Sequence, residues 1–132
     1  HNLALGEMRL GNYRKAAELC YKYEYLSPGN IKILQLLSLA EIYSGDTEKG
    51  RSIAERIIFE FGIESDKINF FVLGTLHLVN GEMKESLKFY RMLSPDTNSW
   101  FEQVSKEFKS LGMWKQNEEK LRLMKEYDLL KI

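Results

Sequence analysis

Residues 3–30 read LALGEMRLGNYRKAAELCYKYEYLSPGN, and this stretch decides the fold. Its apolar residues recur every three to four positions on either side of Gly11, as they do on one face of an α-helix. Glycine at that place would end the first helix because it adopts a positive φ at little cost, and Asn12 could cap the second helix. Pro28 would then stop the second helix. The stretch therefore predicts two helices joined by a short turn.

The same arrangement recurs along the chain at a spacing of about 34 residues. The segments around the turn glycines Gly11, Gly45, Gly81 and Gly112 read LGNYRKAAELC, SGDTEKGRSIA, NGEMKESLKFY and LGMWKQNEEKL. Longer connections follow the second helices, at 27–30, 62–66 and 94–98. In these connections Pro28 and Pro95 would stop the preceding helix, and the candidate caps of the next helix are Ser65, Asp66, Asp96 and Thr97. Asp46, directly after the turn glycine Gly45, could cap the second helix of its hairpin. We expect eight helices in four hairpins, at about residues 1–30, 31–65, 66–96 and 97–132, which form a single all-α domain over residues 1–132.

Composition argues against several classes of function. Lys plus Arg and Asp plus Glu number 19 each, so the chain has no net attraction to nucleic acid or to an anionic membrane. One cysteine and two histidines provide neither an internal disulfide nor a standard zinc site, and we expect no metal and no cofactor. No apolar run is long enough for direct membrane insertion. Because the helical pattern is already under way at His1, we expect a fragment of a longer protein, and the sequence predicts no localisation.

The repeating pattern resembles the tetratricopeptide repeat family over nearly all of the chain. In the first copy the match comprises Gly11, Tyr13, Ala16, Tyr23 and Pro28. The small residue where two helices touch is Ala16, Gly50 and Ser86 in three copies, and the third copy has the family's leucine–glycine pair as Leu73 and Gly74. The fourth copy departs, with Asn117 and Trp114 at the corresponding places. The resemblance implies a right-handed α-solenoid of about four helix-turn-helix hairpins that binds proteins and is not an enzyme.

In that architecture the first helix of each hairpin lines a concave groove. Counting back from the turn glycines assigns to the groove Leu5, Met8, Lys32, Gln35, Leu39, Ile42, Ile68, Phe71, Thr75 and Leu78. Most are apolar, which favours an apolar or amphipathic peptide as the partner. The same count in the fourth hairpin gives Ser99, Glu102, Lys106 and Lys109, so a charged end of the groove is expected there. The other interpretation is that these residues are core, or that a segment of the protein itself lies in the groove.

The family has several uses, and the sequence distinguishes some of them. Co-chaperones that hold the acidic tails of heat-shock proteins use a clamp of polar and cationic side chains. The matching places here are His1, Leu5, Leu36, Ile68 and Val72, which cannot pair with a carboxylate. An assembly scaffold is therefore the preferred interpretation, and a small bacterial secretion-type chaperone that shields a hydrophobic substrate is the alternative. Pentatricopeptide-like RNA binding is less favoured, because Phe71 stands where those repeats have a polar base-reading residue.

Two further parts of the sequence bear on function. His77 and Cys20 are the candidate catalytic residues, but each fits a packed helix better than a catalytic cluster, since no second polar partner is placed beside them by the pattern. The last helix, at about residues 115–132, has Leu121, Met124, Tyr127 and Leu130 along one face, while Leu123 and Leu129 point elsewhere. These surplus apolar residues would allow self-association through the C-terminal helix, or they are core.

Overall fold

The computed structural model describes residues 2–130. His1 and the last two residues of the predicted C-terminal helix, 131–132, lie outside the described residues, as does the side chain of Thr97. The described chain is all-helical and has no strand, which confirms the predicted all-α class. The helices are α1 (Asn2–Arg9), α2 (Tyr13–Leu26), α3 (Ile31–Tyr43), α4 (Thr47–Phe61), α5 (Ile68–Val79), α6 (Met83–Arg91), α7 (Trp100–Ser110) and α8 (Trp114–Leu130). Short 3-10 turns at Ile63–Ser65 and Thr97–Ser99 precede α5 and α7.

The turns inside the hairpins have the predicted backbone geometry. The four turn glycines have φ values between 69° and 101°, a region that other residues rarely adopt. Asp46 caps α4, because its side chain accepts a hydrogen bond from the Lys49 backbone N–H at 3.0 Å. The predicted cap by Asn12 is wrong: its side-chain amide donates to the Glu7 carboxylate at 2.9 Å, and no side-chain cap bond forms at the start of α2.

Small residues allow the two helices of a hairpin to approach closely, as the sequence predicts. Ala16, Gly50 and Ser86 are all buried. A Cβ atom on Gly50 would lie 2.5 Å from the Ile42 side chain, so nothing larger than glycine fits there. The Ser86 hydroxyl fills the same kind of place in the third hairpin and donates to the Gly74 carbonyl at 2.7 Å.

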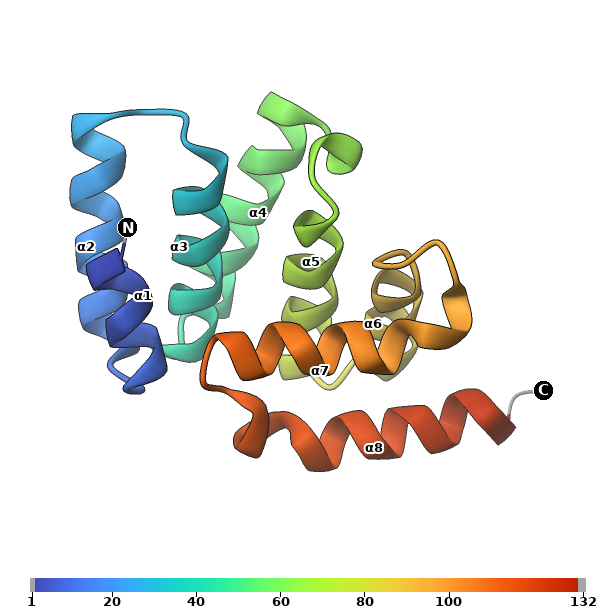
Figure 1. Ribbon diagram of the computed structural model, residues 1–132. Coiled ribbons are helices and arrows are strands. Elements are labelled where there is room, and N and C mark those ends of the chain that lie inside the picture. Colours follow the sequence, from blue (N-terminus) through green and yellow to red (C-terminus); the bar gives the residue numbers. More distant parts are fainter. Residues whose placement is uncertain (1, 131–132) are drawn as a thin grey trace.

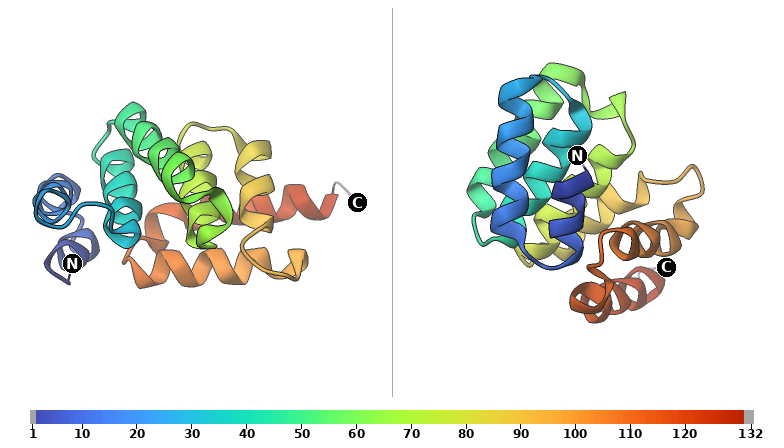
Figure 2. Two further views of the ribbon diagram at one scale, coloured as in Figure 1. Left: turned by 90° about the horizontal axis from the view of Figure 1, so that it is seen from above. Right: turned by 60° about the vertical axis from the view of Figure 1, so that its left-hand side comes forward.

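The first three hairpins stand side by side, with α1, α3 and α5 toward one side of the molecule (Figure 1). The α7–α8 hairpin runs across them rather than continuing the row, and the views in Figure 2 show α7 lying against the side where α1, α3 and α5 are found. In a simple stack each repeat contacts only its neighbours. Here the fourth hairpin packs on the third and also contacts the first two.

Three hydrogen bonds fix the turn of the fourth hairpin against the start of the chain. The Arg9 Nε donates to the Ser110 backbone carbonyl at 2.9 Å, and the Gln116 side-chain amide donates to the Tyr13 hydroxyl. The Tyr43 hydroxyl donates to the side-chain oxygen (Oδ1) of Asn117 at 2.9 Å. Asn117 is buried, and its amide group also donates to the Met113 carbonyl. The departure from the repeat pattern at Asn117 therefore supplies the polar group that Tyr43 binds.

Aromatic side chains hold α7 over α5 and α6. Phe108 on α7 and Phe71 on α5 meet edge to face, with ring centroids 4.8 Å apart. Trp100, at the start of α7, stacks on Tyr90 of α6 at 6.2 Å, and its indole N–H donates to Asp128 of α8. All four rings are buried, so the core continues from the first three hairpins into the fourth.

Candidate interaction groove

A pocket of about 200 Å³ lies between α1, α3 and α5 on one side and α7 on the other. Its lining consists of Leu5, Lys32, Gln35, Leu36, Leu39, Ile68, Phe71, Glu107 and Leu111. Pockets that enclose a drug-sized ligand have volumes of roughly 300–1,000 Å³. This pocket is smaller, and it fits one or two apolar side chains better than a whole small molecule.

The pocket brings together six of the residues that the sequence assigns to the groove: Leu5, Lys32, Gln35, Leu39, Ile68 and Phe71. The other four, Met8, Ile42, Thr75 and Leu78, are at most 5% exposed and do not line it. Thr75, for example, shares a hydrogen bond with the Tyr90 hydroxyl at 2.8 Å inside the third hairpin. Burial alone does not separate the two sets, because Gln35, Leu39 and Phe71 of the pocket are also at most 5% exposed. The difference is that these four do not reach the pocket.

The far wall of the pocket is the chain's own fourth hairpin. Glu107 and Leu111 of α7 and its C-terminal turn line it, and Phe108 covers part of Phe71. Part of the surface of α1, α3 and α5 is therefore covered by the fourth hairpin, which the repeat pattern predicts to continue the groove. What remains open is the narrower space between α7 and the first helices.

Polar contacts between α3 and the start of α5 frame the pocket. The Gln35 amide donates to the buried Asn69 side chain at 2.9 Å, and the Lys32 ammonium pairs with the Asp66 carboxylate. Burial alone would raise the pKa of Asp66, but hydrogen bonds from Lys32, the Ile68 backbone N–H and Gln35 outweigh it and lower the pKa below the ordinary value. Asp66 thus stays ionised, accepts a hydrogen bond from the Ile68 backbone N–H at the start of α5, and holds Lys32 at the rim.

Counting from the turn glycines misses Leu36, Glu107 and Leu111. Leu36 lies one turn after Lys32 on the same helix face, so a wider stripe on α3 would have included it. No count along the sequence could place Glu107 and Leu111, because α7 crosses the other helices instead of aligning with them. The expected charged end of the groove is not found here: Glu102, Lys106 and Lys109 line a separate hollow between α7 and α8.

A buried carboxylate that the sequence pattern does not single out joins the first two hairpins. Glu41 has no exposed surface, and it accepts hydrogen bonds from Arg14 at 2.9 Å and from the Tyr21 hydroxyl at 2.5 Å. The Ser44 hydroxyl also donates to it, and Lys49 lies 4.0 Å away. Burial, together with the Glu41 hydrogen bond and charge, raises the pKa of Tyr21 to about 12. With its oxygens paired in this way, Glu41 serves to hold helices together.

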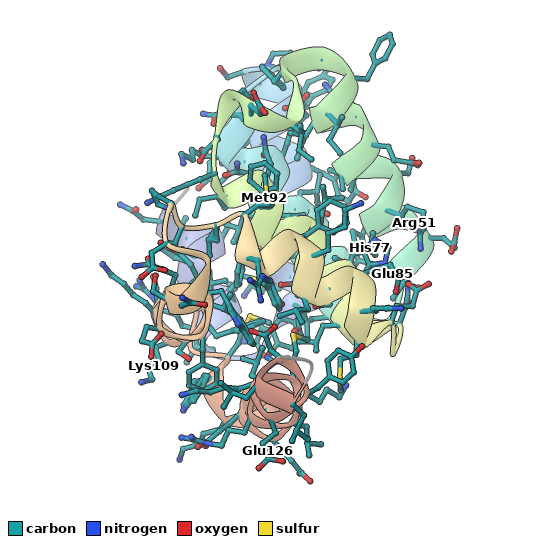
Figure 3. The ribbon with its side chains drawn as sticks, turned by 90° about the vertical axis from the view of Figure 1, so that its right-hand side faces the viewer. Arg51, His77, Glu85, Met92, Lys109 and Glu126 are labelled. Carbon is teal, nitrogen blue, oxygen red and sulfur yellow. The ribbon has the colours of Figure 1, made fainter. Side chains whose placement is uncertain are left out.

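The two candidate catalytic residues do not line the groove. Cys20 is fully buried, and burial raises the pKa of its thiol to about 11, so it is not a ready nucleophile. His77 stacks on Phe89, with ring centroids 5.5 Å apart, and its Nδ1 lies 2.9 Å from the Glu82 carboxylate. Figure 3 shows His77 and Lys109 on opposite sides of the view.

The C-terminal helix uses part of its apolar surface for the core. Leu121 and Met124 are fully buried against the rest of the chain. Tyr127, which the sequence places on the same face, is 36% exposed, and Leu123 and Leu130 are more exposed still. Asp128 turns inward and pairs with Arg91, with 2.6 Å between the charged atoms. An apolar strip therefore remains on the outer side of α8.

Neither a membrane-spanning helix nor a metal-binding cluster occurs within residues 2–130. No helix there is both long and apolar enough to cross a membrane, and no three His, Cys, Asp or Glu side chains are grouped as metal ligands. No protein-family model and no curated protein matches this chain. The function is therefore argued from the geometry of the groove.

Proposed function

We propose that this chain is a protein-interaction module and assembly scaffold, without enzymatic activity, built from hairpins of the tetratricopeptide type. The observation that carries the proposal is the pocket between α7 and the first helices, into which six independently predicted groove residues converge. Its walls are mainly aliphatic and aromatic, with charged side chains from Lys32 and Glu107. Such a site favours a peptide over a small polar metabolite.

The size of the pocket defines what the partner presents. A volume of about 200 Å³ accepts one or two large apolar side chains of a peptide, and the rest of that peptide would lie along the rim. Buried apolar anchors of this kind contribute most of the affinity in protein interfaces. The charged groups of Lys32 and Glu107 then orient the peptide, because a like charge placed beside either of them is unfavourable.

Peptides selected from a random displayed library on the whole chain test this function. The recovered peptides should contain a large apolar residue, and Leu111→Lys should weaken their binding more than tenfold, because the lysine places a charge in the apolar wall. Leu26→Lys is the matched control: it makes the same change at a leucine that is 78% exposed and outside the pocket. Melting curves for both variants verify that folding is intact.

The proposal predicts a clear difference between the two variants. If well-folded Leu111→Lys binds every selected peptide as tightly as Leu26→Lys does, the pocket is not the binding site. If no apolar peptide is recovered at all, the interaction function itself is contradicted.

A further inference from the structure

A second hollow, of about 420 Å³, lies between α7 and α8 and is separate from the groove. Two aromatic rings, Phe101 of α7 and Trp114 of α8, form its apolar part, with centroids 6.0 Å apart in an edge-to-face arrangement. Lys106, Lys109 and Arg122 also line it. We refer to these five residues, together with the adjacent Lys125, as the basic aromatic hollow.

The cations of this hollow are held over the faces of the two rings. The Lys109 ammonium lies 5.0 Å from the Trp114 centroid, and the Lys125 ammonium lies 4.4 Å from the Phe101 centroid. The Arg122 guanidinium is almost equally distant from both ring centroids, at 5.7 Å from Phe101 and 6.0 Å from Trp114. A ring face attracts a cation but does not neutralise it. The positive charges are thus positioned and still able to bind an anion.

The local charge balance is positive although the whole chain has none. Among the described residues, Lys106, Lys109 and Lys125 form no ion pair, and only Arg122 is paired, with Glu118 at 2.9 Å. Glu102 is the one carboxylate in the described lining. Within the lining itself, three cations therefore face one carboxylate, on a chain whose formal net charge is zero. Glu118, Glu119 and Glu126 line the adjoining surface of α8, which Arg122 shares.

We propose that the basic aromatic hollow binds an acidic segment of a partner protein. The cations, held in place by the two rings, would pair with glutamate or aspartate side chains of the segment. This site extends the proposed function, because it gives the molecule a second contact of opposite character to the apolar pocket.

Single-stranded nucleic acid is the other ligand that basic and aromatic residues can bind, and the geometry disfavours it. Bases would have to stack on the ring faces, but those faces are already covered by Lys109, Arg122 and Lys125. A nucleic-acid backbone also needs a continuous basic track, whereas Glu102 and Glu118 interrupt this one. An acidic peptide, with few and separated charges, avoids both problems.

The test uses a short fluorescein-labelled peptide in which glutamate alternates with glycine, titrated with the whole chain. We expect saturable binding, a change in the emission of Trp114, and a several-fold loss of affinity as salt rises from about 50 to about 200 mM. The double variant Lys109→Gln, Lys125→Gln should weaken binding about tenfold, since two of the four cations are lost. The double variant Lys22→Gln, Lys84→Gln, which changes two exposed lysines elsewhere, should bind like the wild type.

Other outcomes would overturn the proposal. An absence of binding at low salt, or equal affinity for the two double variants, shows that the hollow does not bind acidic peptides. Tighter binding of a single-stranded oligouridylate than of the peptide at the same salt assigns the hollow to nucleic acid instead.

Trp114→Leu provides a second variant: it keeps an apolar side chain but removes the ring that holds Lys109 and Arg122, and it should also weaken binding of the acidic peptide. None of these results depends on Leu111 or on the apolar pocket. An experiment that contradicts acidic-peptide binding by the basic aromatic hollow therefore leaves the proposal for the apolar pocket to be tested separately.

Discussion

Replacing Gly74 by alanine should destabilise the protein, although the same change in a helix interior normally stabilises it. Alanine gains roughly 0.5–1 kcal/mol over glycine in a helix, because glycine loses more conformational freedom on folding. At Gly74, however, the new Cβ atom would lie 2.4 Å from two carbons of the Tyr90 ring. Tyr90 has no exposed surface, its hydroxyl is bonded to Thr75, and its ring stacks on Trp100. The ring therefore cannot move aside easily.

The two opposing terms give the size of the effect. Overpacking in a well-ordered core typically costs about 1–3 kcal/mol, which exceeds the gain in helix propensity. We expect a net loss of about 1–2 kcal/mol in the free energy of unfolding, measured by urea denaturation with circular dichroism. Gly6→Ala is the matched control, because Gly6 lies inside α1 and a Cβ atom added there would meet no other part of the molecule within 4 Å. That variant should be stabilised by up to about 1 kcal/mol.

A double-mutant cycle tests the assigned cause. In a Tyr90→Leu background, the ring that Gly74→Ala would strike is absent, so the destabilisation should shrink or change sign. The reasoning is refuted if Gly74→Ala is as stable as the wild type. It is refuted equally if the loss is unchanged when Tyr90 is removed.

Three further predictions concern single side chains. Glu41→Gln should lower the free energy of unfolding by about 1–3 kcal/mol in urea denaturation, because the new amide N–H group is buried among cationic partners. Cys20 should resist a thiol reagent at pH 8 in the native protein and should react once the protein is unfolded. The absorbance of the thiolate that the reagent releases measures this reaction. Prompt reaction of the native protein would contradict the burial of Cys20. Asp66→Asn should be less stable than the wild type above the ordinary aspartate pKa of about 3.9, and the difference should vanish as pH falls through the lowered folded-state pKa. Thermal melts of both proteins at several pH values measure that difference, and an unchanged gap at low pH would contradict the Lys32 pairing.

The helices and turns could be predicted from sequence because their causes are local. A positive φ at Gly45 and a cap at Asp46 depend on residues within one turn of each other, and both are found as predicted. The same holds for the close helix contact at Gly50. Asn12 shows the limit of this reasoning, since Glu7 of the preceding helix competes for its side chain.

The position of the fourth hairpin could not be predicted, because contacts between distant residues determine it. Arg9 binds Ser110 across 101 positions of the chain, and the pairing of Tyr43 with Asn117 spans 74. No spacing rule within a repeat encodes such pairs. The groove count therefore finds pocket residues in the first three hairpins and fails in the fourth, where it selects Lys106 and Lys109 and misses Leu111.

The position of α7 also limits how a partner can use the concave face. A partner that occupied the whole face would have to lift α7, which separates Phe108 from Phe71 and breaks the bond between Arg9 and Ser110. Losing the packing of a buried phenylalanine alone costs about 3–5 kcal/mol, and about 4 kcal/mol corresponds to roughly a thousandfold in affinity. A partner that inserts one or two side chains beside Leu111 avoids this cost. Under the proposed function, the pocket against α7 is therefore the site we expect a partner to use, with α7 as one of its walls.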